Sequence, residues 1–184
     1  MLIATLILVA QVLTPSTNHE PPPVIGYGPW RLGMSKEEVK AVSEFGPYSE
    51  VPSTGGVETK NGLFAERKAN ISFVFGERGL RIIQIWAYEG KDVDEAVNAF
   101  FRVYRHLEST RGRVEIPGLQ IPAHADGGTF SAAVCKVLAS VPTGRAAKLQ
   151  IGPVEKTAGA TTFSSLMSQP QLGYYYVFLY YRFL

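Results

Sequence analysis

The pattern of polar and apolar residues predicts a short helix near the start of the folded region. Ser35 and Glu38 stand three residues apart. This is the spacing of a capping box, in which each side chain satisfies a backbone N–H that the first helical turn leaves free. Gly46 offers a left-handed C-cap, and Pro47 stops further helical growth. We therefore predict a helix over residues 36–45.

A hairpin is predicted after this helix and after a loop rich in Gly, Ser and Thr. Two apolar runs, residues 70–75 and 80–88, flank the sequence "GERG". Apolar runs of strand length around a short glycine-containing segment are typical of a β-hairpin. Ile71, Phe73 and Phe75 alternate with other residues and are expected on one face of the sheet.

A second helix is predicted from the 3.6-residue period that begins at Asp92. Asp92 and Glu95 repeat the capping-box spacing, and Gly112 ends the pattern. The opposite, polar face is expected to carry Arg102 and His106 in solvent, together with Glu95 and Ser109. The residues that recur at helical spacing, and are expected to be buried, are Ala96, Val97, Phe100, Val103, Tyr104 and Leu107.

The last third of the chain is predicted to consist of strands. The segments "SAAVCKVLASV" (131–141) and "AKLQIGPV" (147–154) both contain apolar and β-branched residues. The closing segment "GYYYVFLYYRFL" (173–184) is apolar at odd and even positions alike. Such a strand is expected in the middle of a sheet, covered on both sides.

Together these elements predict the α+β class. The expected architecture is an antiparallel sheet of about five strands with two helices packed on one face. At 184 residues the chain has the size of one domain. We expect that domain to cover residues 25–184.

The N-terminal stretch indicates export. Residues 2–13 are apolar except for Thr5 and Gln11, a run too short to span a membrane as a helix but typical of a signal peptide. No Lys or Arg precedes it, and the alternative is a first core strand or helix of the mature domain. We predict a signal peptide over residues 1–16, a Pro-rich linker over 17–24, and no membrane span in the mature chain.

Composition narrows the possible partners and sites. The 18 basic residues nearly balance the 16 acidic ones, so the basic excess of a nucleic-acid-binding protein is missing. Aromatic residues reach 11%, a composition that favours sheet. The single cysteine, Cys135, excludes an internal disulfide and a cysteine-based metal cluster. It is expected to be a small buried core thiol, and no cysteine is placed for lipid attachment after the apolar run.

The sequences "LGMSKEEVKAVSEFGP" and "ISFVFGERGLRIIQIW" carry a resemblance to a known type of protein. Residues 28–88 resemble the small periplasmic α+β domains of outer-membrane-assembly lipoproteins and of β-lactamase-inhibitor proteins. Two features depart from that type: Gly46 and Pro47 are adjacent, and the lipid-anchoring cysteine is absent. The resemblance implies non-catalytic binding of another protein, and it implies no site residues.

The sequence contains few residues that are placed to act in catalysis or to bind a metal. His124 and Asp126, in "HADGGT", are the strongest candidates for an acid–base or metal-binding loop, although Asp-Gly-Gly is also strong turn chemistry. No second histidine or cysteine has ligand spacing to either of them, and no phosphate-loop or nucleophile-elbow motif occurs. Four arginines between residues 102 and 113 are read as cations near a helix C-terminus rather than as a lipid-binding patch. We predict no cofactor and no metal.

The expected function is therefore that of an exported domain, periplasmic or extracellular, that binds a protein or envelope component without catalysis. One alternative is a carrier of an apolar small ligand, with a pocket lined by the aromatic strands and the second helix. Another is an enzyme of unfamiliar type that uses His124 and Asp126. A deep apolar cavity would favour the carrier, and an exposed aromatic patch would favour the binding domain.

Overall fold

The computed structural model describes residues 25–122, 124–152, 156, 157 and 159–183. The predicted signal peptide over residues 1–16 and the linker over 17–24 lie outside the described residues. The elements in chain order are β1 (Gly26–Tyr27), β2 (Trp30–Arg31), α1 (Lys36–Lys40), the 3-10 helix η1 (Ser43–Phe45), β3 (Tyr48–Val51), β4 (Gly56–Phe64), β5 (Arg67–Gly76), β6 (Gly79–Gly90), α2 (Val93–Arg111), α3 (Gly127–Ser140), β7 (Lys148–Ile151), β8 (Lys156–Thr157), β9 (Ala160–Gln169) and β10 (Tyr174–Phe183).

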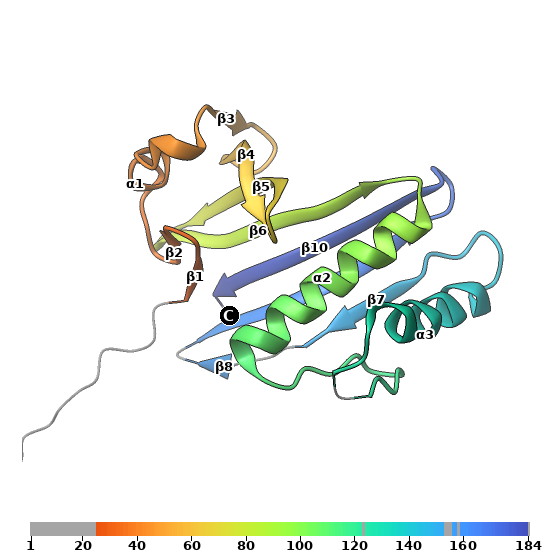
Figure 1. Ribbon diagram of the computed structural model, residues 1–184. Coiled ribbons are helices and arrows are strands. Elements are labelled where there is room, and N and C mark those ends of the chain that lie inside the picture. Colours follow the sequence, from red (N-terminus) through yellow and green to blue (C-terminus); the bar gives the residue numbers. More distant parts are fainter. Residues whose placement is uncertain (1–24, 123, 153–155, 158, 184) are drawn as a thin grey trace, which may run out of the picture.

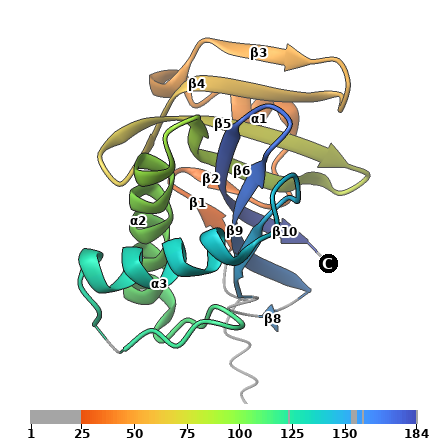
Figure 2. The ribbon, with the colours of Figure 1, turned by 90° about the vertical axis from the view of Figure 1, so that its right-hand side faces the viewer.

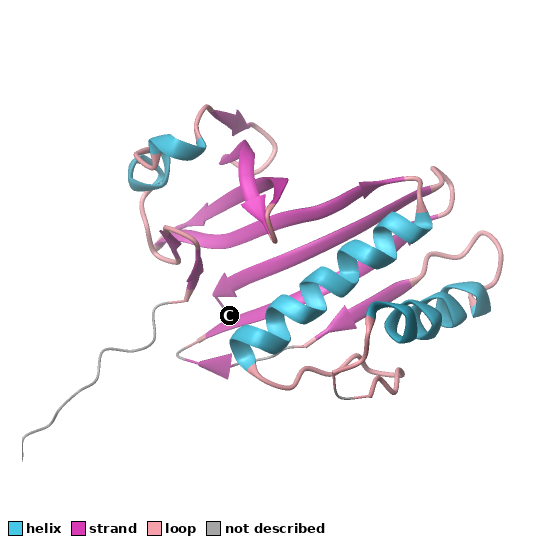
Figure 3. Cartoon of the chain, viewed as in Figure 1, coloured by secondary structure: helices cyan, strands magenta, loops and turns pink. Residues whose placement is uncertain are grey.

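The α+β class is correct, but the sheet is larger than predicted. Its strands follow the order β3-β4-β5-β6-β10-β9-β7, all neighbours antiparallel, and β8 also pairs with β9 (Figure 1). The prediction of about five strands missed β3 and β4, which lie in the segment read as a loop, and it also missed β9 (strands are magenta in Figure 3). The register of β4 shifts between Thr59 and Gly62. This irregularity breaks the period of two by which a strand is recognised in a sequence.

The predicted hairpin is confirmed. β5 and β6 pair with Phe73 opposite Ile83 and with Ile71 opposite Ile85, and all four side chains are buried. Both strands extend beyond the predicted runs.

The first helix is shorter than predicted. The capping box is present: Ser35 Oγ accepts from the Glu38 N–H at 3.1 Å, and the Glu38 carboxylate accepts from the Ser35 N–H at 2.7 Å. However, α1 ends at Lys40 and only η1 follows. The prediction that Gly46 is left-handed is wrong, since its φ of −68° and ψ of 168° describe an extended backbone. Instead, the Val42 carbonyl accepts from the Phe45 N–H at 3.3 Å and from the Tyr48 hydroxyl at 2.8 Å.

The second predicted helix is confirmed as α2, but residues 131–141 are not a strand. They belong to α3, whose N-cap Asp126 accepts from the Thr129 N–H at 2.7 Å. Phe130 and Val134 are the buried residues of this helix, one helical turn apart. Asp-Gly-Gly therefore opens a helix here rather than forming an isolated turn.

The two long helices lie on the same side of the sheet (Figures 1 and 2). α2 crosses β6, β10 and β9, and α3 packs against α2. Phe130 forms the centre of the contact between the helices, with ring centroids 5.9 Å from Phe100 and 5.1 Å from Phe101 and Tyr104. α3 thus shares this face with α2. The predicted helix near residue 36 is α1, and its buried Val39 belongs to the same hydrophobic core.

The terminal strand occupies the predicted central position, because β10 lies between β6 and β9. Its odd-numbered residues Val177, Leu179 and Tyr181 are buried beneath α2. The other half of the prediction is wrong: in the described part of the chain no helix covers the opposite face of the sheet (Figure 2). None of the described helices is both long enough and apolar enough to cross a membrane.

Candidate functional site

The uncovered side of the sheet carries a continuous group of aromatic side chains. Because side chains alternate along a strand, the even-numbered residues of β10 point away from α2. We call this group the aromatic face, and it consists of Trp86 on β6, Phe163 on β9, and Tyr174, Tyr176, Phe178 and Tyr180 on β10.

Strand register brings the three strands of the aromatic face together. Phe178 is opposite Trp86 of β6, and the two rings meet edge to face with centroids 4.7 Å apart. Tyr180 is opposite Phe163 of β9, and these rings stack with centroids 4.6 Å apart. Aromatic pairs across strands stabilise a sheet, so these contacts also fix the rings relative to one another.

The rings along β10 form a ladder. Tyr174 and Tyr176 have centroids 6.1 Å apart with planes 25° apart, and Tyr176 and Phe178 have centroids 5.9 Å apart with planes only 6° apart. Rings stacked along a strand in this way turn their edges and phenolic hydroxyls outward. The outer surface is therefore a mixture of ring edges and hydroxyl groups rather than of flat ring faces.

The aromatic face is close-packed although none of the described helices covers it. Phe178, at its centre, is only 8% exposed, because its neighbours surround it. Met167 on β9 lies opposite Tyr176 and is 37% exposed, which extends the apolar surface. A contiguous apolar patch on a folded surface marks a place where another molecule binds.

Polar residues border this apolar centre on both sides. Lys68, Asn70 and Ser72 of β5 form one border, where the Trp86 indole N–H donates to Ser72 Oγ at 3.3 Å. Lys148 and Gln150 of β7 form the other border. An apolar, aromatic centre inside a polar rim is the usual anatomy of a protein interface.

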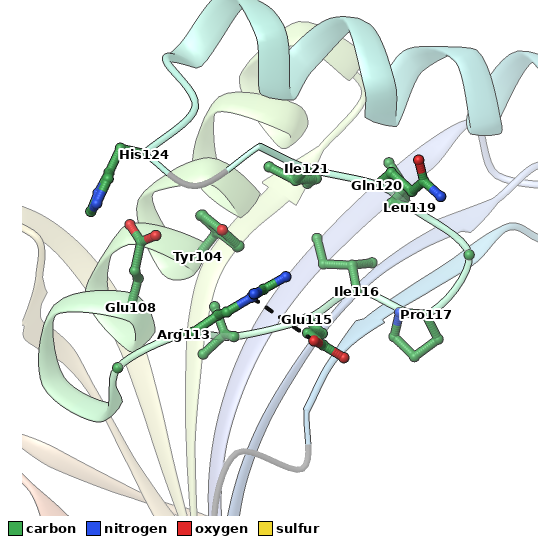
Figure 4. Close-up of a pocket in the computed structure, with 13 residues that line it drawn as sticks. Tyr104, Glu108, Arg113, Glu115, Ile116, Pro117, Leu119, Gln120, Ile121 and His124 are labelled. Carbon is green, nitrogen blue, oxygen red and sulfur yellow. Dashed lines mark ion pairs between the residues drawn. The ribbon is translucent and has the colours of Figure 1, made fainter.

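A separate pocket lies at the C-terminal end of α2 (Figure 4). It has a volume of about 710 Å³ and is bounded by the irregular segment that joins α2 to α3. Val114, Ile116, Leu119 and Ile121 supply its apolar lining. This pocket is on the helix side of the molecule and shares no residue with the aromatic face.

His124 lines this pocket, but Asp126 does not join it there in a catalytic pair. The Asp126 carboxylate is the N-cap of α3, and its hydrogen bonds with Thr129 lower the pKa of the carboxyl group. Glu108, the other carboxylate near His124 in Figure 4, bonds Arg105 Nη1 at 2.5 Å. Within the described residues, no three His, Cys, Asp or Glu side chains are grouped so that they could hold a metal ion.

His106 is not the solvated residue that was predicted. It is half-buried, with its ring 5.3 Å from Phe64 and 6.1 Å from Tyr27, and its Nε2 atom lies 3.2 Å from the Tyr181 hydroxyl. Burial, and secondarily the charge of Arg111, lowers the pKa of His106. The histidine is thus part of the packing between α2 and β10, and it is not among the residues that line the pocket of His124.

The other candidate residues are Cys135 and the four arginines between residues 102 and 113, and their contacts are structural. Cys135 is a free, half-buried thiol on α3 that packs against the core rather than lying in a strand. Arg105 pairs with Glu108, and Arg113 pairs with Glu115 at 4.0 Å. Arg102 is partly buried, and this burial lowers its pKa. The four arginines therefore do not form one exposed cationic patch.

The aromatic face was missed from the sequence because the terminal strand was expected to be covered on both sides. Comparison with protein-family models, with curated proteins and with solved structures finds no match for this chain. The assignment of a function therefore depends on the site itself.

Proposed function

We propose that this chain is an exported, non-catalytic domain that binds a protein or another component of the cell envelope. The binding surface is the aromatic face. The proposal places the mature domain in the periplasm or outside the cell, after removal of residues 1–16.

One observation carries the proposal: six aromatic side chains lie together on the side of the sheet that the described helices leave open. A sheet normally buries its apolar face against another layer of the same domain. Here the described chain supplies one helical layer only. A binding partner would supply the second layer and remove the aromatic rings from water, which favours association.

The arrangement of titratable groups supports a role without catalysis. A catalytic acid or base needs a partner that orients it. Asp126 is engaged as a helix cap, and Glu108 is engaged by Arg105. His124 therefore has no carboxylate from these two residues that is free to orient it.

Site-specific photo-crosslinking in the native host tests the proposal. A photoreactive phenylalanine analogue replaces Met167, which is exposed at the edge of the aromatic face. The matched control carries the same analogue at Lys136, an exposed residue of α3 on the other side of the sheet. We expect a discrete adduct from position 167 and none from position 136. Equal adducts at both positions, or none at position 167, would reject the proposal.

A second candidate function, the carrier of an apolar small ligand, has one observation in its favour. The pocket beside α2 has a volume in the range of small-molecule sites and a lining that is partly apolar. Native mass spectrometry of protein purified from its host distinguishes the two. The carrier requires a bound small molecule that Ile116→Asp removes, whereas the binding domain requires none.

A further inference from the structure

We infer that the aromatic face binds a different protein whose docking surface is apolar at its centre and acidic at its edge. This inference rests on the proposed function and deepens it, because it selects one class of partner from among envelope components. The orientation of the rings, the polar groups among them and the charges around them carry the inference.

The orientation of the rings disfavours a glycan. Sugars bind aromatic side chains by lying flat on an exposed ring face. Along β10 the ring faces of Tyr174, Tyr176 and Phe178 are turned toward one another, with planes within 25°. The Tyr180 ring stacks on Phe163 with planes 15° apart. What these rings present outward is edges and hydroxyl groups, the mixture that Tyr-rich protein-binding surfaces use.

Polar groups within the aromatic face disfavour insertion into a lipid bilayer. Gln84 lies opposite Tyr180, and Ser165 lies opposite Phe178, so both sit among the rings. The hydroxyls of Tyr174, Tyr176 and Tyr180 add three more polar groups. A membrane-inserting face needs a continuous apolar surface, because hydrocarbon leaves polar groups unsatisfied. A protein partner can instead form hydrogen bonds with Gln84 and with the tyrosine hydroxyls.

The charges around the aromatic face are mainly positive. Lys68 and Lys148 flank it, Lys91 lies 5.4 Å from the Tyr174 ring centroid, and Arg182 lies 5.9 Å from the Phe163 ring centroid. In the described part of the chain none of these four cations forms an ion pair with a carboxylate. The buried Nε atom of Arg182 also has no hydrogen-bond acceptor there. An acidic rim on the partner would pair with the charges of these four cations.

Among the strand residues that the structure describes, two carboxylates lie on this side of the sheet. Glu58 follows the buried Val57 on β4, and Glu89 is opposite Tyr176. The four cations named above thus outnumber these two carboxylates. A second copy of the chain would bring the same excess of positive charge, and like charges across an interface oppose association. The surface thus favours a different, acidic protein over self-association.

Trp86 is the expected anchor of the interface. It lies between the apolar centre and the β5 border, with its indole N–H fixed by Ser72 and its ring packed against Phe178. Trp, Tyr and Arg side chains held in this way dominate the energetics of protein interfaces. A preorganised ring also loses little conformational entropy when the partner binds.

A displayed library of random linear peptides tests the inference with the full mature chain as target. The wild-type protein should select peptides that combine aromatic or aliphatic residues with Asp and Glu, and Trp86→Ser should weaken their binding by about tenfold or more. The variant Lys91→Glu, Lys148→Glu should instead select peptides rich in Lys and Arg. The variant Lys136→Glu, Arg78→Glu has the same net charge but lies away from the aromatic face, and should select as the wild type does.

Several results would overturn the inference. One is selection of the same peptides by the wild type and by the rim variant, and another is the absence of any peptide that depends on Trp86. Trp86-dependent binding of chitohexaose would indicate a glycan, and Trp86-dependent binding of phosphatidylcholine–phosphatidylglycerol vesicles would indicate a membrane. Concentration-dependent dimerisation that Trp86→Ser abolishes would indicate a second copy.

The crosslinking experiment above separates this inference from the proposed function. If position 167 yields a protein whose crosslinked surface is basic, the inference fails while the proposed function stands. If position 167 yields no adduct of any kind, the proposed function itself fails. A protein adduct with an acidic crosslinked surface supports both.

Discussion

The Nε2 atom of His106 lies 3.2 Å from the hydroxyl oxygen of Tyr181, and this contact joins α2 to the central strand of the sheet. Tyr27, from the N-terminal hairpin of β1 and β2, packs against both rings, with centroids 6.1 Å from His106 and 5.8 Å from Tyr181. The Tyr27 hydroxyl donates to the Leu63 carbonyl of β4 at 2.7 Å. Four segments distant in the sequence, namely the N-terminal hairpin, β4, α2 and β10, thus meet around a half-buried histidine.

This histidine should make the stability of the fold depend on pH. Burial and the Arg111 charge favour neutral His106, so its folded pKa lies below the ordinary 6.5. The contribution to stability is therefore complete above about pH 6.5 and is lost as the pH falls through the lowered folded pKa. Urea denaturation across this range should show a falling free energy of unfolding. His106→Phe should show a smaller dependence, and an unchanged slope in that variant would contradict the assignment.

Loss of the first N-cap should lower stability modestly. Ser35→Ala removes the acceptor for the Glu38 N–H, and an N-cap of this kind contributes on the order of 1 kcal/mol. Chemical denaturation measures the change, with Ser53→Ala in an exposed loop as the control. Equal midpoints for the two variants would mean that water replaces the cap.

Residues on the two faces of β10 should respond in opposite ways to substitution. Leu179 is fully buried beneath α2, so Leu179→Asp places an unpaired charge in the core and should prevent stable folding. Tyr176→Ser alters the open side and should leave a folded, soluble protein. Circular dichroism and thermal unfolding of the pair provide the check. Folded Leu179→Asp protein would show that the helical layer is misplaced.

The predicted acid–base candidates should be dispensable for function. In the double variant His124→Ala, Asp126→Ala, the first change removes a pocket side chain and the second removes the N-cap of α3. We expect somewhat lower stability and full complementation of the phenotype caused by deletion. Loss of function at unchanged folded protein level would instead indicate chemistry in the pocket beside α2.

Local signals in the sequence were sufficient for some elements and insufficient for others. Helix α2 has its N-cap at Asp92, a complete apolar period and a terminal Gly112. These signals all lie within the helix sequence, so they were sufficient to predict it. Helix α3 is different, because its valines favour a strand while its alanines favour a helix. The packing of Phe130 between Phe100, Phe101 and Tyr104 decides the outcome, and that contact is tertiary.

The aromatic face depends even more on tertiary packing, and the sequence alone was not sufficient to predict it. Tyrosine and phenylalanine occur at both odd and even positions of β10, so the sequence predicts two apolar faces without saying which is covered. The answer depends on where α2 and α3 pack, and thus on the whole topology. Tyr181 becomes a core residue, whereas Tyr180, its neighbour in the chain, becomes part of the open surface.

Oxidation of Met167 offers the most direct test of whether the aromatic face is covered by a partner. Peroxide converts an accessible methionine to its sulfoxide, and Met34, on the helix side of the sheet, serves as the internal reference. The rates for both residues are compared by mass spectrometry between the purified protein and the protein in its native envelope. We predict that Met167 oxidises more slowly in the envelope while Met34 is unchanged. Equal rates for Met167 in both settings would contradict binding through the aromatic face.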